Sequence, residues 1–325
     1  MTNGMKRIAN GLCALACVLA AANAAAQAYP VKPVKIVVPF GAGGIADITA
    51  RVLALKMSET MGQQVIVENR PSAGGIVAAE AVAKSDPDGY TLLLMSNGTA
   101  VSAGLFKTLP YDTIKDFAPV STAGFFDLVL LANGDAPFAT VKDLVAFAKA
   151  NPNKLNIGSI NIGSTQHLAA ELFKSMAAID AQVVPFKGTP AVITALRGGE
   201  IQVAIEILGP AMAQIKAGSL KALGIASTRR FAGLPNVPTI AESGVPGYQA
   251  SSWNGIAVPA KTPRAIVERL QKEISVAVAA PEVWQRLQDL GVEARSSTPE
   301  ALRDLLASEI AKWGAVIEKA KLEKQ

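Results

Sequence analysis

Residues 34–47 read VKIVVPFGAGGIAD and decide the fold class of this chain of 325 residues. The apolar, β-branched run Val34–Val38 predicts a buried strand, and the glycines between Gly41 and Gly44 end it. A helical periodicity follows, carried by Ile48, Val52, Leu55 and Met57. A strand that passes through a glycine-rich turn into a helix opens a βαβ unit, so this stretch predicts an α/β protein.

The same alternation continues outward to residue 96. Val65–Val67 and Thr91–Met95 read as further strands, and Ile76–Ala83 reads as a helix that begins after Gly74 and Gly75. The strands are nearly continuous apolar runs. We therefore expect a parallel sheet with helices on both faces.

A second unit of similar size begins in the middle of the chain. Thr140 and Asp143 form a predicted capping box ahead of an apolar helix. Alternating strands and helices then continue to residue 226. The predicted strands are Leu128–Ala132, Leu155–Gly158, Val183–Phe186, Ile201–Ile205 and Leu220–Ala226, and the predicted helices cover 163–176 and 191–196.

The end of the chain returns to helices with one apolar face. Thr262-Pro263 and Thr298-Pro299 each predict an N-cap followed by proline at the first helical position. Such helices need a sheet to pack on, and we expect the first unit to supply it. The chain then crosses between the units near Phe126 and again near Ser251. Two crossings make a hinge and a cleft between lobe 1 (residues 29–125 and 252–325) and lobe 2 (residues 126–251).

The first 28 residues predict a secretory signal peptide that is removed. Lys6 and Arg7 precede an apolar segment over 8–22, and small residues follow. We therefore expect cleavage near residues 26–28 and export of the mature chain to the periplasm. Cys13 and Cys17 are the only cysteines and lie in this segment, so the mature chain can form no disulfide. A retained membrane anchor and a lipoprotein cleaved before Cys17 are the alternatives.

Composition narrows the function classes. The chain has 31 Lys and Arg against 26 Asp and Glu, a net charge of +5, and Lys6 and Arg7 contribute two of these charges. This weak excess forms no basic stripe with interleaved aromatic residues, which argues against nucleic-acid binding. Half of the residues are apolar, and the length suffices for two domains with cores of their own.

The loop Gly41–Ala46 allows several interpretations. It fits the dinucleotide fingerprint G-x-G-x-x-A, and Glu68 follows about 20 residues later. Glycines and a helix N-terminus can equally hold any anion, a carboxylate included, and a plain turn is the third reading. Export argues against NAD. We assign ligand binding to this loop, with Asp47 either capping the helix or ordering the loop. The assigned residues are Phe40, Ala42, Gly43, Gly44 and Asp47.

Two polar loops are the next candidates. Ser96, Asn97 and Thr99 follow the third predicted strand, at the edge where open α/β sheets bind ligands, although a plain turn is the alternative. Ser164 and Thr165 lie in the matching loop of the second unit. We assign all five residues to the ligand site.

Three further candidates follow strands of the second unit. Lys187 and Gly188 lie in a loop that supplies a positive group or forms a surface turn. Glu206 ends the predicted strand Ile201–Ile205. It either faces the cleft, where it would suit an ammonium group on the ligand, or lies at an exposed strand end.

Catalytic and metal chemistry find no support in the sequence. His167 is the only histidine, the mature chain has no cysteine, and no G-x-S-x-G elbow occurs. We therefore expect no catalytic residue, no metal and no cofactor, and His167 is either a helix-end hydrogen-bonding residue or a ligand contact.

Short motifs occur in order along the whole mature chain. They are Tyr29-Pro30, Pro39-Phe40, Gly43 to Asp47, Glu68 to Pro71, Pro87 to Leu92, Pro110 to Asp112, Gly163-Ser164 with His167-Leu168, Phe186 to Gly188, Val237 to Thr239, Glu242 to Gly244, and Trp253. Together they resemble the tripartite tricarboxylate transporter receptor family, the solute-binding proteins of Bug/TctC type.

The resemblance implies a fold and a function. The fold is a two-lobed periplasmic-binding fold (type II, Venus flytrap) that closes on a small organic acid: a di- or tricarboxylate, an acidic amino acid or an aromatic acid. The partner is a membrane permease of one large and one small subunit, and we expect a monomer. The resemblance places the pocket at the loops around Phe40 to Asp47, Asn97 and Ser164.

One departure from the family pattern bears on the ligand. The strand before Pro210 usually carries two aspartates, and this chain has Gln202 and Glu206 there, with Ile205 in place of an aromatic residue. Two other functions stay open at this stage. They are a nucleotide-binding oxidoreductase built on Gly41–Ala46, and a ligand-binding sensor subunit that signals to a membrane kinase.

Overall fold

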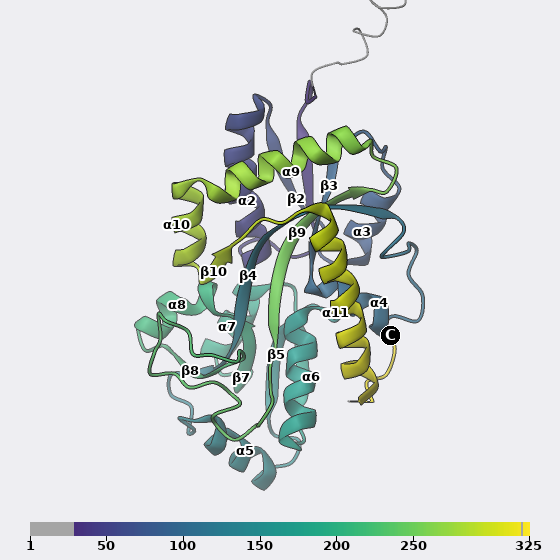
Figure 1. Cartoon of the computed structure of the whole chain (residues 1–325). Coiled ribbons are helices and arrows are strands. Elements are labelled where there is room, and N and C mark those ends of the chain that lie inside the picture. Colours follow the sequence, from purple (N-terminus) through teal and green to yellow (C-terminus); the bar gives the residue numbers. More distant parts are fainter. Residues whose placement is uncertain (1–28, 320) are drawn as a thin grey trace, which may run out of the picture.

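The computed structural model describes residues 29–319 and 321–325 (Figure 1). The predicted signal peptide, with Cys13 and Cys17, lies outside these residues. The described chain forms two α/β lobes joined by a shared mixed sheet, and the expected two-lobed fold is confirmed.

The first lobe is built around residues 34–47, the strand, glycine-rich turn and helix start that predicted the fold class. The strands β1 (Val34–Val38), β2 (Val65–Asn69) and β3 (Thr91–Ser96) are parallel, as predicted, and lie in the order β2-β1-β3. The helices α2 (Ile45–Met61) and α3 (Ile76–Ala83) connect them, and a short 3₁₀ turn (Ala73–Gly75) precedes α3. After β3 the chain enters α4 (Asn97–Leu105), where the sequence predicted a ligand-binding loop or a plain turn and no helix.

Two long strands join the lobes. The strand β4 (Phe117–Asn133) pairs with β9 (Ser251–Pro259) in the first lobe and with β7 (Val203–Ile207) and β8 (Leu220–Ile225) in the second. Both run through the middle of the molecule (Figure 1), and β9 also pairs with β3. These contacts are antiparallel, so the full sheet is mixed, and the parallel sheet predicted from residues 34–95 is only its outer part.

The second lobe repeats the pattern. The strands β5 (Asn156–Ile160) and β6 (Gln182–Phe186) lie beside β7 in parallel. Four helices cover this sheet: α5 (Val141–Ala150), α6 (Thr165–Ala177), α7 (Thr189–Arg197) and α8 (Leu208–Lys216). The predicted capping box is present, because Thr140 Oγ1 accepts from Asp143 N and the Asp143 carboxylate accepts from Thr140 N.

The prediction for β7 was displaced by two residues. The strand covers Val203–Ile207 instead of Ile201–Ile205, because Ile201 and Gln202 form a bend after α7. Glu206 therefore lies inside a buried strand and has no exposed surface. The alternative of an exposed strand end for Glu206 is wrong.

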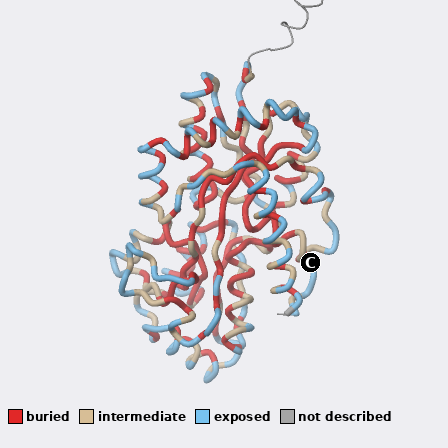
Figure 2. The backbone as a smooth tube through the Cα atoms, viewed as in Figure 1, coloured by how far each residue is buried: buried red, intermediate tan, exposed pale blue. Residues whose placement is uncertain are grey.

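Each central strand contributes to two apolar cores. In β1, Ile36 and Val38 face the core under α2, whereas Val37 faces the opposite core with Leu93 and Trp253. Residues on both faces are buried because helices cover both faces, which explains the continuous apolar runs in the sequence. Figure 2 shows this buried sheet running through both lobes.

The C-terminal helices pack on the first lobe. They are α9 (Arg264–Ala279), α10 (Pro281–Asp289) and α11 (Pro299–Lys319), with the short strand β10 (Val292–Ala294) between the last two. Thr298 caps α11 as predicted, since its Oγ1 accepts from Ala301 N at 3.1 Å. The helix α9 is present as predicted, but its predicted N-cap was wrong: Pro263 is itself the N-cap, and the Thr262 hydroxyl is buried without a partner. In the described part of the chain, no helix combines the length and apolar character needed to cross a bilayer.

Candidate functional site

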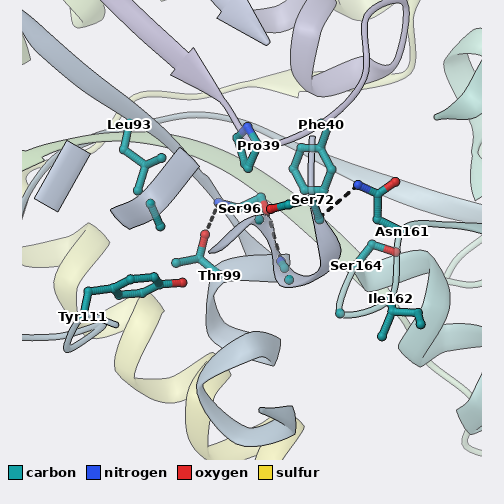
Figure 3. Close-up of a pocket in the computed structure, with 15 residues that line it drawn as sticks. Pro39, Phe40, Ser72, Leu93, Ser96, Thr99, Tyr111, Asn161, Ile162 and Ser164 are labelled. Atoms are coloured by element: carbon teal, nitrogen blue, oxygen red, sulfur yellow. Dashed lines mark hydrogen bonds between the residues drawn. The ribbon is translucent and has the colours of Figure 1, made fainter. Parts of the chain in front are cut away.

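Two adjoining cavities lie where the strands of the lobes end. Phe40 and Ser96 line both of them. The cavities hold about 330 and 380 Å³ of space between protein atoms, open to solvent in part. Figure 3 shows the first cavity, which has Phe40, Ser96 and Thr99 of lobe 1 on one side and Asn161, Ile162 and Ser164 of lobe 2 on the other. We call the first the outer cavity and the second, which Asn254, Gln166 and Thr189 also line, the inner cavity.

Six helices begin at the walls of these two cavities. Their N-cap residues, all of which line one cavity or both, are Gly44 (α2), Gly75 (α3), Ser96 (α4), Ser164 (α6), Gly188 (α7) and Ile207 (α8). The first N–H groups of a helix have no partner within it, and the helix dipole favours a negative charge there. No N-cap side chain accepts from the first turn of α2, α3, α7 or α8, although Ser72 Oγ accepts from Val77 N of α3 and Glu206 Oε2 lies beside the starts of α7 and α8.

No charged residue is among those that line the two cavities. The walls combine apolar side chains, hydroxyl and amide groups, and backbone. A site of this composition attracts an anion through N–H dipoles instead of through lysine or arginine.

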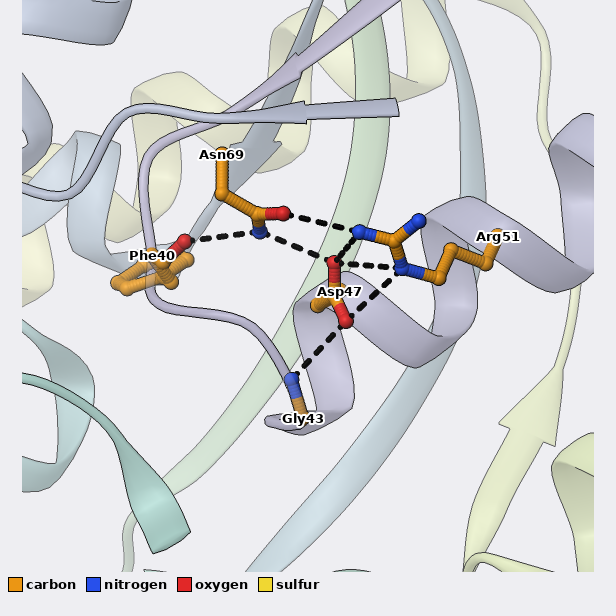
Figure 4. A network of polar contacts seen from close by, with 5 residues as sticks. All are labelled: Phe40, Gly43, Asp47, Arg51 and Asn69. Carbon is orange, nitrogen blue, oxygen red and sulfur yellow. Dashed lines mark hydrogen bonds and ion pairs between the residues drawn. The ribbon is translucent and has the colours of Figure 1, made fainter. Parts of the chain in front are cut away.

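Asp47 holds the loop that precedes α2. Its carboxylate accepts from Gly43 N at 2.9 Å, from Asn69 Nδ2 at 3.0 Å and from Arg51 Nε at 3.0 Å. Asn69 Nδ2 also reaches the Phe40 carbonyl, so the whole loop is tied to β2 (Figure 4). Burial raises the pKa of Asp47, but the hydrogen bonds from Arg51, Gly43 and Asn69 outweigh this effect and the pKa lies below its usual value. Asp47 itself lines neither cavity.

The predicted loop at Ser96 is the first turn of α4. Ser96 Oγ accepts from Gly98 N, and Thr99 Oγ1 accepts from Ser96 N. Both residues line the outer cavity. Asn97 is buried instead: its Nδ2 donates to the Ser251 carbonyl, and its Oδ1 accepts from Trp313 Nε1 at 2.8 Å. The Asn97 side chain thus links α4 to the start of β9 and to α11.

The matching loop of lobe 2 caps α6. Ser164 Oγ accepts from His167 N, and Thr165 Oγ1 forms a hydrogen bond of 3.1 Å with Ser252 Oγ. Ser164 lines the outer cavity and Thr165 the inner one. His167 lines neither. Burial lowers the pKa of its imidazole, and Nδ1 has no hydrogen-bond partner.

The remaining predicted residues divide between the wall and the layer behind it. Gly44 and Gly188 line the inner cavity, whereas Ala42, Gly43 and the exposed Lys187 line neither. Glu206 lies one layer behind the inner cavity. Its Oε2 accepts from two residues that line that cavity, Gln166 at 3.4 Å and Thr189 at 3.1 Å.

The sequence reasoning missed several wall residues. Ser252 and Asn254 lie on the cleft side of β9, and Trp253 between them faces the core behind it. Small polar residues at alternate positions of an apolar strand were the signal for this pair. Ser72, Gly74, Gly75, Tyr111, Asn161, Gln166 and Thr189 were also missed, because they come together only in the folded chain.

The two lobes touch across the outer cavity. Gly74 N donates to the Ile162 carbonyl at 2.7 Å, and Asn161 Nδ2 donates to the Ser72 carbonyl at 3.1 Å. Gly74 and Gly163 both have positive φ, and a Cβ on Gly163 would lie 2.9 Å from Gly74 Cα. The two lobes are therefore in direct contact beside the outer cavity.

We find no metal site and no better candidate for an anion site among the other described residues. They contain no group of three His, Cys, Asp or Glu able to hold a metal ion. A larger hollow of about 1060 Å³ lies behind the hinge, lined by Asp127, Arg229, Phe231 and Glu293 among others. It is open, carries both signs of charge, and none of the helix N-caps named above lines it.

Comparison with known proteins decides the family. The family model described as "Tripartite tricarboxylate transporter family receptor" (TctC) matches residues 49–322, most of the chain. The chain belongs to the tripartite tricarboxylate transporter receptor family. A relative in the tcbD-tcbE intergenic region of Pseudomonas sp. strain P51 is 39% identical over 292 residues, which cover 90% of this chain and 87% of the relative.

Solved structures of TctC/Bug-type proteins share the fold. The periplasmic binding protein BugD superposes with a TM-score of 0.88 at 33% identity, covering 91% of this chain and all of BugD. Rpa4515 of R. palustris, solved with adipate, has a TM-score of 0.87 at 33% identity and covers 90% and 98% of the two chains. MatC of Rhodopseudomonas palustris, solved with bound malate, has a TM-score of 0.85 at 33% identity and covers 89% and 100%.

Family membership sets the class of function. The protein is a periplasmic solute-binding receptor of TctC/Bug type, and members of this family bind substrates instead of transforming them. The oxidoreductase interpretation of Gly41–Ala46 is therefore set aside. Gly41 and Gly44 of that segment form part of the cleft wall at the start of α2.

Proposed function

We propose that this receptor captures a small organic carboxylate and delivers it to a membrane permease of one large and one small subunit. The candidate ligands are di- and tricarboxylates, acidic amino acids and aromatic acids. Residues 29–125 with 252–325 form one lobe and 126–251 the other, and the exported protein acts as a monomer after cleavage near residues 26–28.

The convergence of six helix N-termini on a cleft without charged side chains supports this function most directly. A carboxylate in this cleft accepts hydrogen bonds from the N–H groups of several helix termini, and the dipole of each helix favours its negative charge. The ligand-binding residues of the proposal are those that line the cavities, with Asp47 holding the loop in place.

The structural neighbours are consistent with this ligand class. Adipate and malate, bound in Rpa4515 and MatC, are both small dicarboxylates.

A thermal-shift screen tests the proposal. The protein is expressed from the full chain, purified from the periplasm of a bacterial host and melted with each acid of the three classes and with NAD. A ligand at about 100 times its Kd adds roughly 2.7 kcal/mol to the free energy of unfolding, which raises Tm by several degrees. A shift with a carboxylate and none with NAD supports the proposal. A shift with NAD alone, or recovery of the protein only from the cytoplasm, contradicts it.

A further inference from the structure

Glu206 is a buried carboxyl group without a cationic partner. It has no exposed surface, and no lysine, arginine or histidine of the described chain forms an ion pair with it. Its Oε2 accepts from Gln166 Nε2, Thr189 Oγ1 and Ile207 N, at 3.4, 3.1 and 3.2 Å. Its Oε1 has no partner. A buried carboxyl group with an unsatisfied oxygen is costly unless something compensates for it.

The location of this carboxyl group changes what the second lobe offers a ligand. Ile207 is the N-cap of α8 and Thr189 is the first residue of α7. Glu206 Oε2 therefore lies at two of the helix N-termini that face the inner cavity. When Glu206 is ionised, it places a negative charge at this position, so a second carboxylate of the ligand is repelled there.

Two side chains of the inner wall each direct a hydrogen toward Glu206. A threonine hydroxyl has one hydrogen, and Thr189 donates it to Glu206, so only lone pairs of Thr189 remain for the cavity. Gln166 donates one of its two amide hydrogens to the same oxygen, which leaves the other hydrogen and the carbonyl oxygen for further contacts. Both residues line the inner cavity, and each has an acceptor oxygen for a donor on the ligand.

Asn254 supplies a second unsatisfied group in the same cavity. It is 1% exposed, it lines the inner cavity, and neither its Nδ2 nor its Oδ1 has a partner. Most buried side-chain polar atoms are hydrogen-bonded in folded proteins. An unpaired amide facing a cavity thus points to a polar group of the ligand.

We propose that this receptor selects carboxylates that also carry an N–H or O–H donor, held at the inner wall of Gln166 and Thr189 that Glu206 polarises. This inference rests on the proposed function and names the substrate class within it. The ligand carboxylate binds at a helix N-terminus away from Glu206, such as that of α2, and its donor meets the acceptor oxygens of Gln166 and Thr189. Glu206 acts here as a positioning residue.

Isothermal titration with matched acids tests the inference. Succinate, malate and aspartate share one skeleton and differ in a hydrogen, a hydroxyl or an ammonium group. Benzoate and its 4-hydroxy and 4-amino derivatives repeat the comparison with one carboxylate. At pH 8, the acid with a donor is expected to bind at least about tenfold more tightly than its parent in one series, consistent with one or two hydrogen bonds to a charged acceptor network. Malate and aspartate distinguish a hydroxyl donor from an ammonium donor.

Three variants connect this preference to Glu206. In Glu206→Gln the amide can turn an N–H toward Gln166 and Thr189, so the preference is expected to fall below about threefold. Thr189→Val removes the hydroxyl while keeping the shape, and lowers the preference in the same direction. Glu273→Gln is the matched control, because Glu273 is also buried but pairs with Arg269 on α9.

Each result has one meaning. Equal affinity for parent and donor acids, or an unchanged preference in a folded Glu206→Gln protein, overturns the inference while the carboxylate receptor stands. Absence of binding by every acid overturns the proposed function and the inference with it. Circular dichroism establishes that each variant is folded, and Thr189→Val decides the question if Glu206→Gln is not.

Discussion

Single residues in this receptor divide into those that touch the cleft and those that hold it. Asn97, Asp47 and Glu206 all look like binding residues in the sequence, because each follows a strand or opens a helix. In the structure they lie behind the wall and fix it through hydrogen bonds. Position at the end of a strand predicted the neighbourhood of the site, but the direction of each side chain depends on neighbours that the sequence does not place.

Glu206 makes the stability of the protein depend on pH. Burial raises the pKa of Glu206 from 4.5 to about 7, against hydrogen bonds from Gln166, Ile207 and Thr189 that lower it. Between these values the folded protein holds a proton that the unfolded chain has lost. This proton adds about 3 kcal/mol to the free energy of unfolding below pH 4.5, and the contribution is lost as the pH rises to 7. Urea unfolding is expected to show that the free energy of unfolding falls by this amount between pH 4.5 and 7 in the native protein and not in Glu206→Gln. Parallel pH profiles for the two proteins would exclude this role of Glu206.

Asp47 is expected to contribute more to stability than its partner Arg51. Asp47→Ala removes the acceptor for Gly43 N, Asn69 Nδ2 and Arg51 Nε and costs about 2–4 kcal/mol of the free energy of unfolding. The Arg51 side chain is 52% exposed, so Arg51→Gln is expected to cost about 1 kcal/mol or less. Denaturant unfolding of both variants at pH 7 measures the difference, and equal losses would show that the ion pair alone matters. Ligand affinity also falls in Asp47→Ala, because the loop it ties down forms the cleft wall.

At the scale of elements, the sequence predicted most of the helices and strands that surround the site. Periodicity located α2, α3, α6 and α7, and turn residues located their starts, because local sequence determines caps and amphipathic faces. It did not predict the helices α4 and α8, nor the strand β9 or the full length of β4. These strands lie between two lobes, and their pairing partners are distant in the chain, so no local pattern encodes them. Ser252 and Asn254 were missed together with β9, although small polar residues at alternate positions of an apolar stretch were a local signal for them.

Gly41 gives a direct test of closure. Its backbone does not have positive φ, so alanine fits locally, but a Cβ would overlap the Lys187 carbonyl of the opposite lobe. Gly41→Ala is therefore expected to leave ligand-free stability unchanged within about 0.5 kcal/mol and to weaken ligand binding by at least about tenfold. Calorimetric titration and denaturant unfolding measure the two quantities.

Gly314 provides the control for that variant. It lies within α11, and a Cβ there meets nothing within 4 Å. Gly314→Ala is expected to stabilise the helix by about 0.5–1 kcal/mol and to leave affinity unchanged. If both alanine variants bind ligand like the native protein, the contact of Gly41 with Lys187 does not limit closure.

For the whole molecule, the two hinge strands and the direct contacts between the lobes imply an opening motion. A compact chain of this size has a radius of gyration of about 19 Å. Small-angle scattering is expected to give this value with ligand and a larger one without it, because opening breaks the bonds from Gly74 to Ile162 and from Asn161 to Ser72. A value near 19 Å in both conditions would show that the lobes stay closed without ligand. In Gly41→Ala, added ligand is expected to reduce the radius less than in the native protein.

The uncharged cleft has an evolutionary consequence. Main-chain N–H groups at helix starts are supplied by the fold, and among the standard amino acids only proline removes one. A lineage can therefore exchange the side chains around them without losing the capacity to hold a carboxylate. The neighbours solved with adipate and with malate are each about one-third identical to this chain and keep its fold. Because backbone N–H groups hold the carboxylate, a receptor can change its ligand specificity through substitutions at only the residues that contact the rest of the acid.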